Sequence, residues 1–125
     1  MAGERFDLVG RLRSFRHAFA GLGFVLRTQH NAWVHLAAAA VVVAAGLALR
    51  ISPTDWRWLV VAIVLVWFAE TVNTAFEHLC DVVSPELHAS VRRAKDVAAG
   101  AVLICSVGAA VLGVMIFWPY LAAAR

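Results

Sequence analysis

Charged residues and turn-forming residues are scarce in this sequence. Only 15% of the 125 residues are Asp, Glu, Lys or Arg, whereas an ordinary soluble domain has about 25%. Hydrophobic residues make up 62%, which excludes a disordered chain. The length allows one domain rather than two. We therefore expect a single membrane domain, residues 1–125, in which the few charges at membrane depth carry the function.

The sequence also lacks the short motifs of the common nucleotide-binding folds. It contains neither a GxxxxGK[ST] loop nor a GxGxxG loop. It is too short and too apolar for a soluble enzyme with its own nucleotide-binding sheet, so any ATP site must be built from helix ends and side chains. The two cysteines, Cys80 and Cys105, form no CxxC pair, and we interpret them as buried thiols.

Basic residues are distributed unevenly along the chain, whose net charge is +3. We attribute this charge to membrane orientation, and we expect no nucleic-acid partner. Charge close to the N-terminus also predicts that no signal peptide is cleaved. The positive-inside rule predicts a cytoplasmic N-terminus and an external C-terminus. The cytoplasmic side would carry eight basic residues (Arg5, Arg11, Arg13, Arg16, Arg27, Arg92, Arg93 and Lys95) and the outside three (Arg50, Arg57 and Arg125).

Three stretches are apolar enough to cross a bilayer, which takes roughly 20 helical residues. An uncharged stretch between Arg27 and Arg50 predicts a span at about residues 32–50. The segment after Pro53 predicts a second span at about 56–78 with a cytoplasmic extension, and Ser52 or Thr54 can cap this helix. A third span is predicted at about 94–119. Aromatic residues near the span ends suit the membrane interface: Trp56, Trp58, Trp118 and Tyr120.

The first 30 residues follow a different pattern, which predicts an amphipathic surface helix at about residues 5–28. Its apolar residues recur at spacings of 4, 3, 4, 3 and 4, and several arginines lie off that stripe. The same apolar stripe could also pack against protein, and this interpretation is compatible with a surface helix. The apolar positions are Leu8, Leu12, Phe15, Phe19, Leu22 and Leu26.

Small residues are frequent in the third span, and they predict close helix packing there. These are Ala98, Ala99, Gly100, Ala101, Gly108 and Gly113. The first span holds one histidine, His35, which we interpret as a packed or interfacial residue rather than a ligand.

The second span carries polar residues on one narrow face near its cytoplasmic end. At 100° per residue, Glu70, Asn73, Glu77 and Asp81 fall at about 0°, −60°, −20° and +20°. Glu70 and Glu77 are separated by about 10 Å along the helix axis. A carboxylate at membrane depth costs several kcal/mol unless it is paired or neutralised, which makes this face a candidate functional site.

Three interpretations of this acidic face are open. The face could be a polar patch paired with basic residues of the next loop (Arg92, Arg93 or Lys95). It could instead conduct protons or cations through Glu70 and Glu77 in a small oligomeric channel. The third interpretation is a catalytic site, in which oxygen ligands favour Mg²⁺ over zinc and Mg²⁺ arrives with nucleotide phosphates.

Several motifs together resemble the prokaryotic diacylglycerol kinase family, which includes the undecaprenol kinases. One is Glu70-Thr-Val-Asn73-Thr-Ala-Phe-Glu77-His-Leu-Cys-Asp81. It is followed by Ser84-Pro-Glu86-Leu-His88 and by Arg93-Ala-Lys95-Asp96, and the resemblance covers residues 11–118. It implies a homotrimer in the bacterial inner membrane, with each active site shared between neighbouring subunits. The reaction it implies is phosphorylation of a membrane lipid alcohol, diacylglycerol or undecaprenol, by ATP with Mg²⁺.

The resemblance also assigns roles to individual residues. Glu70 matches the general base for the lipid hydroxyl, and Glu70 and Ala99 match lipid-substrate contacts. Glu77 matches a metal ligand that also contacts the nucleotide. Asn73 and Asp81 match further polar positions of the site. Nucleotide contacts are implied for Glu86, His88, Lys95 and Asp96.

The sequence departs from the family pattern in two respects, one at Gln29 and one on the surface helix, where Arg11 or Arg13 could replace the missing Arg. Family members usually have Glu where this chain has Gln29, so the metal and nucleotide contact expected there is an uncharged amide. On the surface helix, the enterobacterial Arg and Tyr that touch nucleotide correspond to Gly10 and His17, and His17 remains a candidate ATP contact. The spacing of Asn31 and His35 is closer to that of the undecaprenol kinases.

Overall fold

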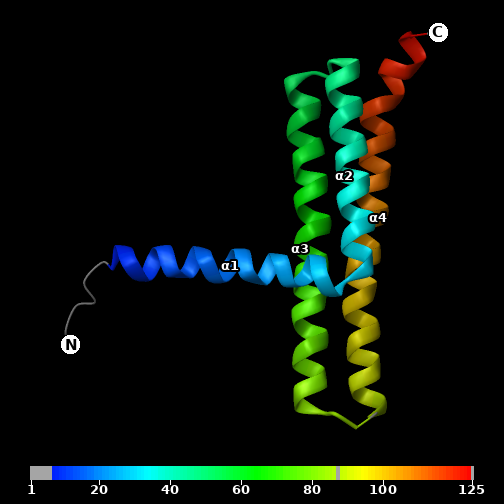
Figure 1. The fold of residues 1–125 in the computed structure, drawn as a ribbon. Coiled ribbons are helices and arrows are strands. Elements are labelled where there is room, and N and C mark those ends of the chain that lie inside the picture. Colours follow the sequence, from blue (N-terminus) through cyan, green and yellow to red (C-terminus); the bar gives the residue numbers. More distant parts are fainter. Residues whose placement is uncertain (1–6, 87, 125) are drawn as a thin grey trace, which may run out of the picture.

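The computed structural model describes residues 7–86 and 88–124, and this part of the chain is helical, without a strand. Its four helices are α1 (Leu8–Thr28), α2 (His30–Leu49), α3 (Pro53–Val83) and α4 (Ala89–Ala123). In Figure 1, α2, α3 and α4 run side by side as a bundle, and α1 lies crosswise to them. The all-helical prediction is confirmed. The expected start of the surface helix near residue 5 lies outside the described residues.

Three of the helices, α2, α3 and α4, are long and apolar enough to cross a membrane, as predicted. They contain 20, 31 and 35 residues, so α3 and α4 exceed the roughly 20 residues of one span. We refer to the α2–α3 junction as the upper end of the bundle and to the ends of α3 and α4 at Val83 and Ala89 as its lower end. Figure 1 shows that α3 and α4 continue below the level of α1.

The sharp change of direction between α1 and α2 occurs at Gln29. This residue has extended backbone angles (φ −103°, ψ 115°), which interrupt the helix for one residue. Its N–H donates to the Val25 carbonyl at 2.9 Å, and its own carbonyl accepts from the Ala32 N–H at 3.2 Å. Gln29 therefore ends α1 and starts α2, and it lies where the crosswise helix meets the bundle.

The upper junction is a short turn that requires a small residue. Arg50 adopts left-handed angles (φ 51°, ψ 49°) and closes α2 through hydrogen bonds from its N–H to the Gly46 and Leu47 carbonyls. A Cβ on Gly46 would lie 3.0 Å from the Trp56 ring and 3.1 Å from Ile51 Cδ1, so a larger residue would require these side chains to shift. Ser52 caps α3 by accepting from the Asp55 N–H, as predicted, and Pro53 occupies the first turn.

A hydrogen-bonded group also joins α4 to this junction. Tyr120 Oη donates to Asp55 Oδ2 at 2.6 Å and accepts from the Ser52 N–H at 2.8 Å. A small apolar core packs beside it, formed by Ile51, Leu59 and Ile116. Tyr120 was expected to mark the membrane interface, but its side chain also connects two helices that are far apart in sequence.

Contacts toward the lower end connect α3 to α1 and to α4. The Phe24 and His78 rings meet edge to face with centroids 4.9 Å apart. Lys95 of α4 pairs with Asp81 of α3, where both side chains are partly exposed. An added Cβ at Gly100, Gly108 or Gly113 would meet no atom within 4 Å, so these glycines contact no other helix of the same chain. Close packing of the third span against another molecule stays a prediction. Cys80 and Cys105 are free and half-buried rather than fully buried.

Candidate active site

A cavity of about 310 Å³ lies between α2, α3 and α4 near the α1–α2 junction. We refer to it as the polar cavity, because seven of its eleven lining residues are polar. The structure brings five of the predicted site residues to this one cavity: Gln29, Glu70, Asn73, Glu77 and Ala99. The remaining lining residues are Asn31, Val34, His35, Val102, Leu103 and Ser106.

Glu70 is the most deeply buried polar residue of this cavity, with 1% of its surface exposed. Its Oε2 atom accepts no hydrogen bond from any described residue. The nearest cation-forming group is His35 Nε2, at 3.5 Å. A buried carboxylate oxygen without a hydrogen bond is costly, and groups of this kind gather at functional sites.

Asn73 fixes the orientation of Glu77, one helical turn further along α3. Asn73 Nδ2 donates to Glu77 Oε1 at 3.1 Å. This bond leaves the other oxygen of Glu77 without a partner from Asn73. Asn73 Oδ1 is buried and also has no hydrogen-bond partner among the described atoms. Glu77 Oε2 and Asn73 Oδ1 are therefore the two oxygen atoms of this pair that can accept a hydrogen bond or a metal.

The donor set of this region fits Mg²⁺. The carboxylate of Glu77 and the amide of Gln29 offer oxygen atoms at the same cavity. The described residues contain no cluster of three or more His, Cys, Asp or Glu that would hold a metal alone. Mg²⁺ usually keeps several waters and binds one or two carboxylates together with substrate phosphates, so a sparse oxygen site of this kind suits it.

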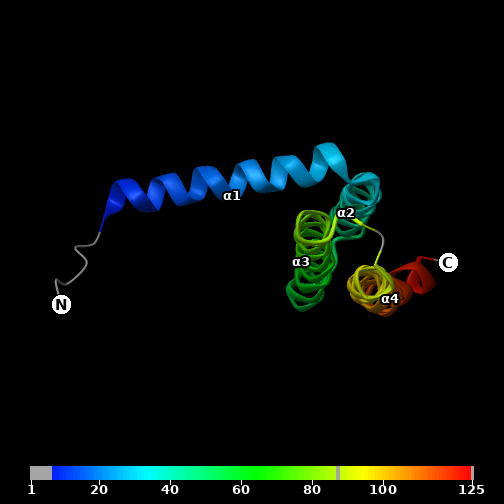
Figure 2. The ribbon, with the colours of Figure 1, turned by 90° about the horizontal axis from the view of Figure 1, so that it is seen from below.

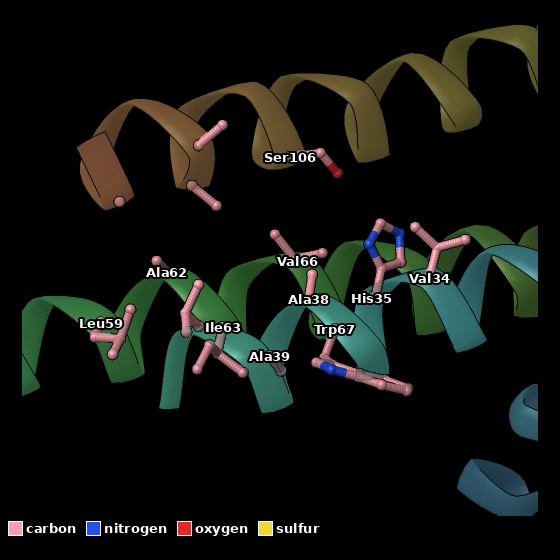
Figure 3. Close-up of a pocket in the computed structure, with 14 residues that line it drawn as sticks. Val34, His35, Ala38, Ala39, Leu59, Ala62, Ile63, Val66, Trp67 and Ser106 are labelled. Carbon is pink, nitrogen blue, oxygen red and sulfur yellow. The ribbon is translucent and has the colours of Figure 1, made fainter. Parts of the chain in front are cut away.

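A second cavity of about 310 Å³ lies above the polar cavity. Its lining is almost wholly aliphatic, so we refer to it as the apolar cavity. The two cavities share Val34, His35 and Ser106 and therefore adjoin. Figure 3 shows His35 on α2 and Ser106 on α4 near one end of the apolar cavity, with Leu59 and Ala62 toward its other end. A molecule with a polar head and an apolar chain would fit this arrangement.

Most of the predicted nucleotide contacts lie outside the polar cavity. Lys95 is half-buried and precedes Ala99 by one helical turn, about 6 Å, toward the lower end. It pairs with Asp81, whereas Asp96 is exposed. His88 Nδ1 accepts from the Ser90 N–H at 3.3 Å and so caps α4, and the exposed Glu86 accepts from the His88 N–H through its carbonyl at 2.8 Å.

His17 is exposed on α1 and lines neither cavity. Figure 2 shows that α1 projects away from the bundle on one side. His17 therefore lies on the helix that leaves the bundle, outside both cavities of its own chain.

Three polar residues that line this cavity were not assigned to the site from the sequence: Asn31, His35 and Ser106. Each is a single polar residue in or beside an apolar helix. Asn31 and His35 are four residues apart and so share one face of α2, which is a signal of a common environment. Ser106 has no comparable partner nearby in the sequence.

Comparison with known proteins agrees with the geometry. The family model described as "Prokaryotic diacylglycerol kinase" matches residues 16–117. The chain belongs to the prokaryotic diacylglycerol kinase family. It is 36% identical over 118 residues to the undecaprenol kinase of Bacillus subtilis (strain 168), covering 94% of this chain and 96% of that protein. It is 34% identical over 109 residues to the diacylglycerol kinase of Synechocystis sp. (strain ATCC 27184 / PCC 6803 / Kazusa), covering 86% of this chain and 62% of that protein.

Membership of this family identifies the chain as a lipid kinase of the membrane. The family model covers the site helices from before Gln29 to beyond Ser106. The buried carboxylate face of α3 therefore belongs to a phosphotransferase.

Proposed function

We propose that this kinase transfers the γ-phosphoryl group of ATP to the hydroxyl of a membrane lipid alcohol, with undecaprenol as its acceptor. The observation that carries the proposal is the buried Glu70 Oε2 of the polar cavity, which has no hydrogen-bond partner among the described residues. It lies 3.5 Å from His35, a residue that lines both cavities. The choice of undecaprenol rests on the Bacillus subtilis undecaprenol kinase, 96% of which aligns with this chain. The Synechocystis diacylglycerol kinase extends well beyond the aligned region.

Glu70 acts as the general base in this proposal. The lipid O–H bond breaks and its proton passes to the Glu70 carboxylate, while the lipid oxygen forms a bond to the γ-phosphorus. The bond between the γ-phosphorus and the β,γ-bridging oxygen breaks, and ADP leaves. The position of Glu70 suits this task, since its buried Oε2 has no hydrogen-bond partner among the described residues and can accept the lipid O–H.

Glu77 and Gln29 would hold Mg²⁺ together with the nucleotide phosphates. Asn73 contributes by fixing one oxygen of Glu77, which leaves the second oxygen for the metal. Bound Mg²⁺ supplies positive charge next to the β- and γ-phosphates. The neutral amide of Gln29 contributes an oxygen atom but no charge, so Glu77 is the dominant protein ligand in this proposal.

The remaining predicted residues form the nucleotide side of the site. Lys95 lies one helical turn from the polar cavity and offers its charge to a phosphate once it leaves Asp81. Asp96, Glu86 and His88 lie on the same lower part of the bundle, where a nucleotide from the aqueous phase arrives first. His17 would contact the nucleotide of a neighbouring chain.

The kinase acts as a homotrimer with shared sites in this proposal, and its lower end faces the cytoplasm. One observation supports shared sites: α1 leaves its own bundle (Figure 2), so the residues on it lie beside a neighbouring chain in such an assembly. Native mass spectrometry of the detergent-solubilised protein should give three copies. Labelling of cysteines introduced near residue 92 and near residue 123 should place these sites on opposite sides of the membrane.

The direct test uses purified kinase in phosphatidylcholine vesicles with γ-³²P-labelled ATP. Undecaprenol and diacylglycerol are supplied separately at equal mole fraction. We expect labelled undecaprenyl phosphate to form at least tenfold faster than labelled phosphatidic acid. Faster labelling of diacylglycerol would show that diacylglycerol is the preferred acceptor, and the lipid kinase activity itself would stand.

The Glu70→Gln variant tests the base. We expect kcat to fall by about 10²- to 10⁴-fold while the oligomer and ATP binding are retained. Asp55→Asn is the matched control, since it changes a carboxylate to an amide on the same helix, outside both cavities. Near-normal phosphorylation by Glu70→Gln would refute the role of Glu70. Ion flux without ATP through vesicles, with no lipid labelling, would instead support the ion-conductor hypothesis.

A further inference from the structure

Two buried polar atoms face each other across a short gap in the polar cavity, and neither has a hydrogen-bond partner. They are His35 Nε2 and Glu70 Oε2, 3.5 Å apart. The His35 side chain is 15% exposed and the Glu70 side chain 1% exposed. Both residues line the polar cavity, and His35 also lines the apolar cavity.

The separation is longer than a direct hydrogen bond between these atoms, which would measure about 2.7–2.9 Å. A separation of 3.5 Å is compatible with one hydroxyl oxygen about 2.8 Å from each atom. Both atoms are buried in the chain without lipid, so the pair must open slightly to admit that oxygen. A hydroxyl group donates one hydrogen bond and accepts others, so it satisfies a carboxylate oxygen and an imidazole N–H at the same time. A thioether or an ester carbonyl lacks the donor that Glu70 requires.

We propose that His35 and Glu70 together form the binding pair for the acceptor hydroxyl, with the lipid O–H donating to Glu70 Oε2 and the lipid oxygen accepting from His35 Nε2–H. The inference rests on the proposed function and adds a substrate-binding residue to it. His35 carries its proton on Nε2 in this arrangement. The pair recognises a primary alcohol at the head of an apolar chain, because the apolar cavity begins at the same histidine.

This arrangement determines which lone pair of the lipid oxygen reacts. One lone pair accepts the His35 hydrogen bond and the O–H bond is directed at Glu70, which leaves the second lone pair for the γ-phosphorus. The proton passes to Glu70 when the new O–P bond forms, and His35 keeps its proton throughout. His35 therefore orients the nucleophile, a contribution that positioning makes to phosphoryl transfer.

The other polar groups of the cavity are placed less well for this task. Asn73 donates to Glu77, and Ser106 lines the cavity from α4 without a recorded hydrogen bond to Glu70. His35 Nε2 lies 3.5 Å from Glu70 Oε2, so it can donate a hydrogen bond to a hydroxyl group that also contacts Glu70. Figure 3 shows its ring directed from α2 toward the space between the helices.

The test compares steady-state kinetics of His35→Leu, His35→Gln and the wild type in vesicles, with undecaprenol and ATP varied in turn. Leucine removes the donor, and glutamine returns an N–H donor at a similar distance from the backbone. We expect kcat/KM for undecaprenol to fall roughly 10- to 100-fold in His35→Leu and to recover most of the wild-type value in His35→Gln. The KM for ATP should stay within twofold in both variants. His30→Leu, at an exposed histidine on the same helix, should match the wild type.

The outcomes separate this inference from the proposed function. If the wild-type protein labels no lipid alcohol, both the proposed function and this inference are refuted. Labelling by the wild type together with an unchanged kcat/KM for undecaprenol in His35→Leu would overturn the hydroxyl-binding pair alone. Equal losses of kcat/KM for undecaprenol in folded His35→Leu and His35→Gln would also overturn it, because the N–H donor would then have no effect on binding. A rise in the KM for ATP in His35→Leu that matches the loss for undecaprenol would overturn it as well.

Discussion

Asn73 Nδ2 donates a hydrogen bond to Glu77 Oε1 at 3.1 Å, between two residues one helical turn apart on α3. Asn73 is buried, whereas Glu77 is half-buried and nearer to the lower end. Both residues line the polar cavity, and the pair connects its buried part, where Glu70 lies, to the half-buried Glu77. In the proposed mechanism this bond directs the free oxygen of Glu77 toward the metal.

Replacement of Asn73 by Ala should therefore weaken metal binding more than catalysis at saturating metal. Residues that orient a metal ligand typically contribute 10- to 100-fold to metal affinity. We expect the Mg²⁺ concentration for half-maximal activity to rise at least tenfold, measured at fixed ATP. Thr74→Val is the matched control at the next buried polar residue, whose hydroxyl donates to the Glu70 carbonyl rather than to a site side chain. An unchanged Mg²⁺ requirement in Asn73→Ala would contradict the prediction.

The Gln29→Glu substitution should have the opposite effect. A carboxylate adds negative charge beside Glu77 at a position that already lines the cavity, so the half-maximal Mg²⁺ concentration should fall severalfold. Asn31→Asp places the same charge in the same cavity and shows how much of the effect comes from charge alone. Equal half-maximal Mg²⁺ concentrations for Gln29→Glu and the wild type would show that the residue at position 29 does not bind the metal.

The Lys95→Met variant should raise the KM for ATP about tenfold or more, because it removes a positive charge one turn from the polar cavity. Lys95→Arg should retain part of the affinity. Steady-state kinetics with varied ATP measures both. Arg93→Met, which removes a charge two residues earlier on α4, serves as the control and should leave the KM for ATP close to normal. If both methionine variants behave alike, Lys95 acts through general charge rather than through a phosphate contact.

The Tyr120→Phe variant should lower stability without lowering the activity of the folded enzyme. The change removes the donor to Asp55 and the acceptor for the Ser52 N–H, which join α4 to the upper junction. We expect the Tm in detergent to fall by roughly 5 °C. Trp118→Phe, at an exposed aromatic two residues earlier, should shift the Tm much less. A large loss of kcat at a temperature where Tyr120→Phe remains folded would show that this end of the bundle also affects the site.

A large part of the fold could be predicted from single segments of the sequence. Apolar length predicts α2, α3 and α4, and the polar period of α3 places Glu70, Asn73 and Glu77 on one face. Helix ends were less predictable than the spans: α4 begins at Ala89, where His88 caps it, five residues before the expected start of the third span. Capping by a histidine gives a weaker sequence signal than capping by Ser, Thr, Asp or Asn.

The sequence by itself determined that this chain is a helical membrane protein with a carboxylate face, because hydropathy and helical period are properties of one segment at a time. Tertiary structure alone decided which side chains of other helices reach that face. The approach of His35 to Glu70 and the bond from Tyr120 to Asp55 join residues 35 and 65 positions apart. Such contacts depend on how α2 and α4 are rotated against α3, and nonlocal packing rather than local pattern sets that rotation.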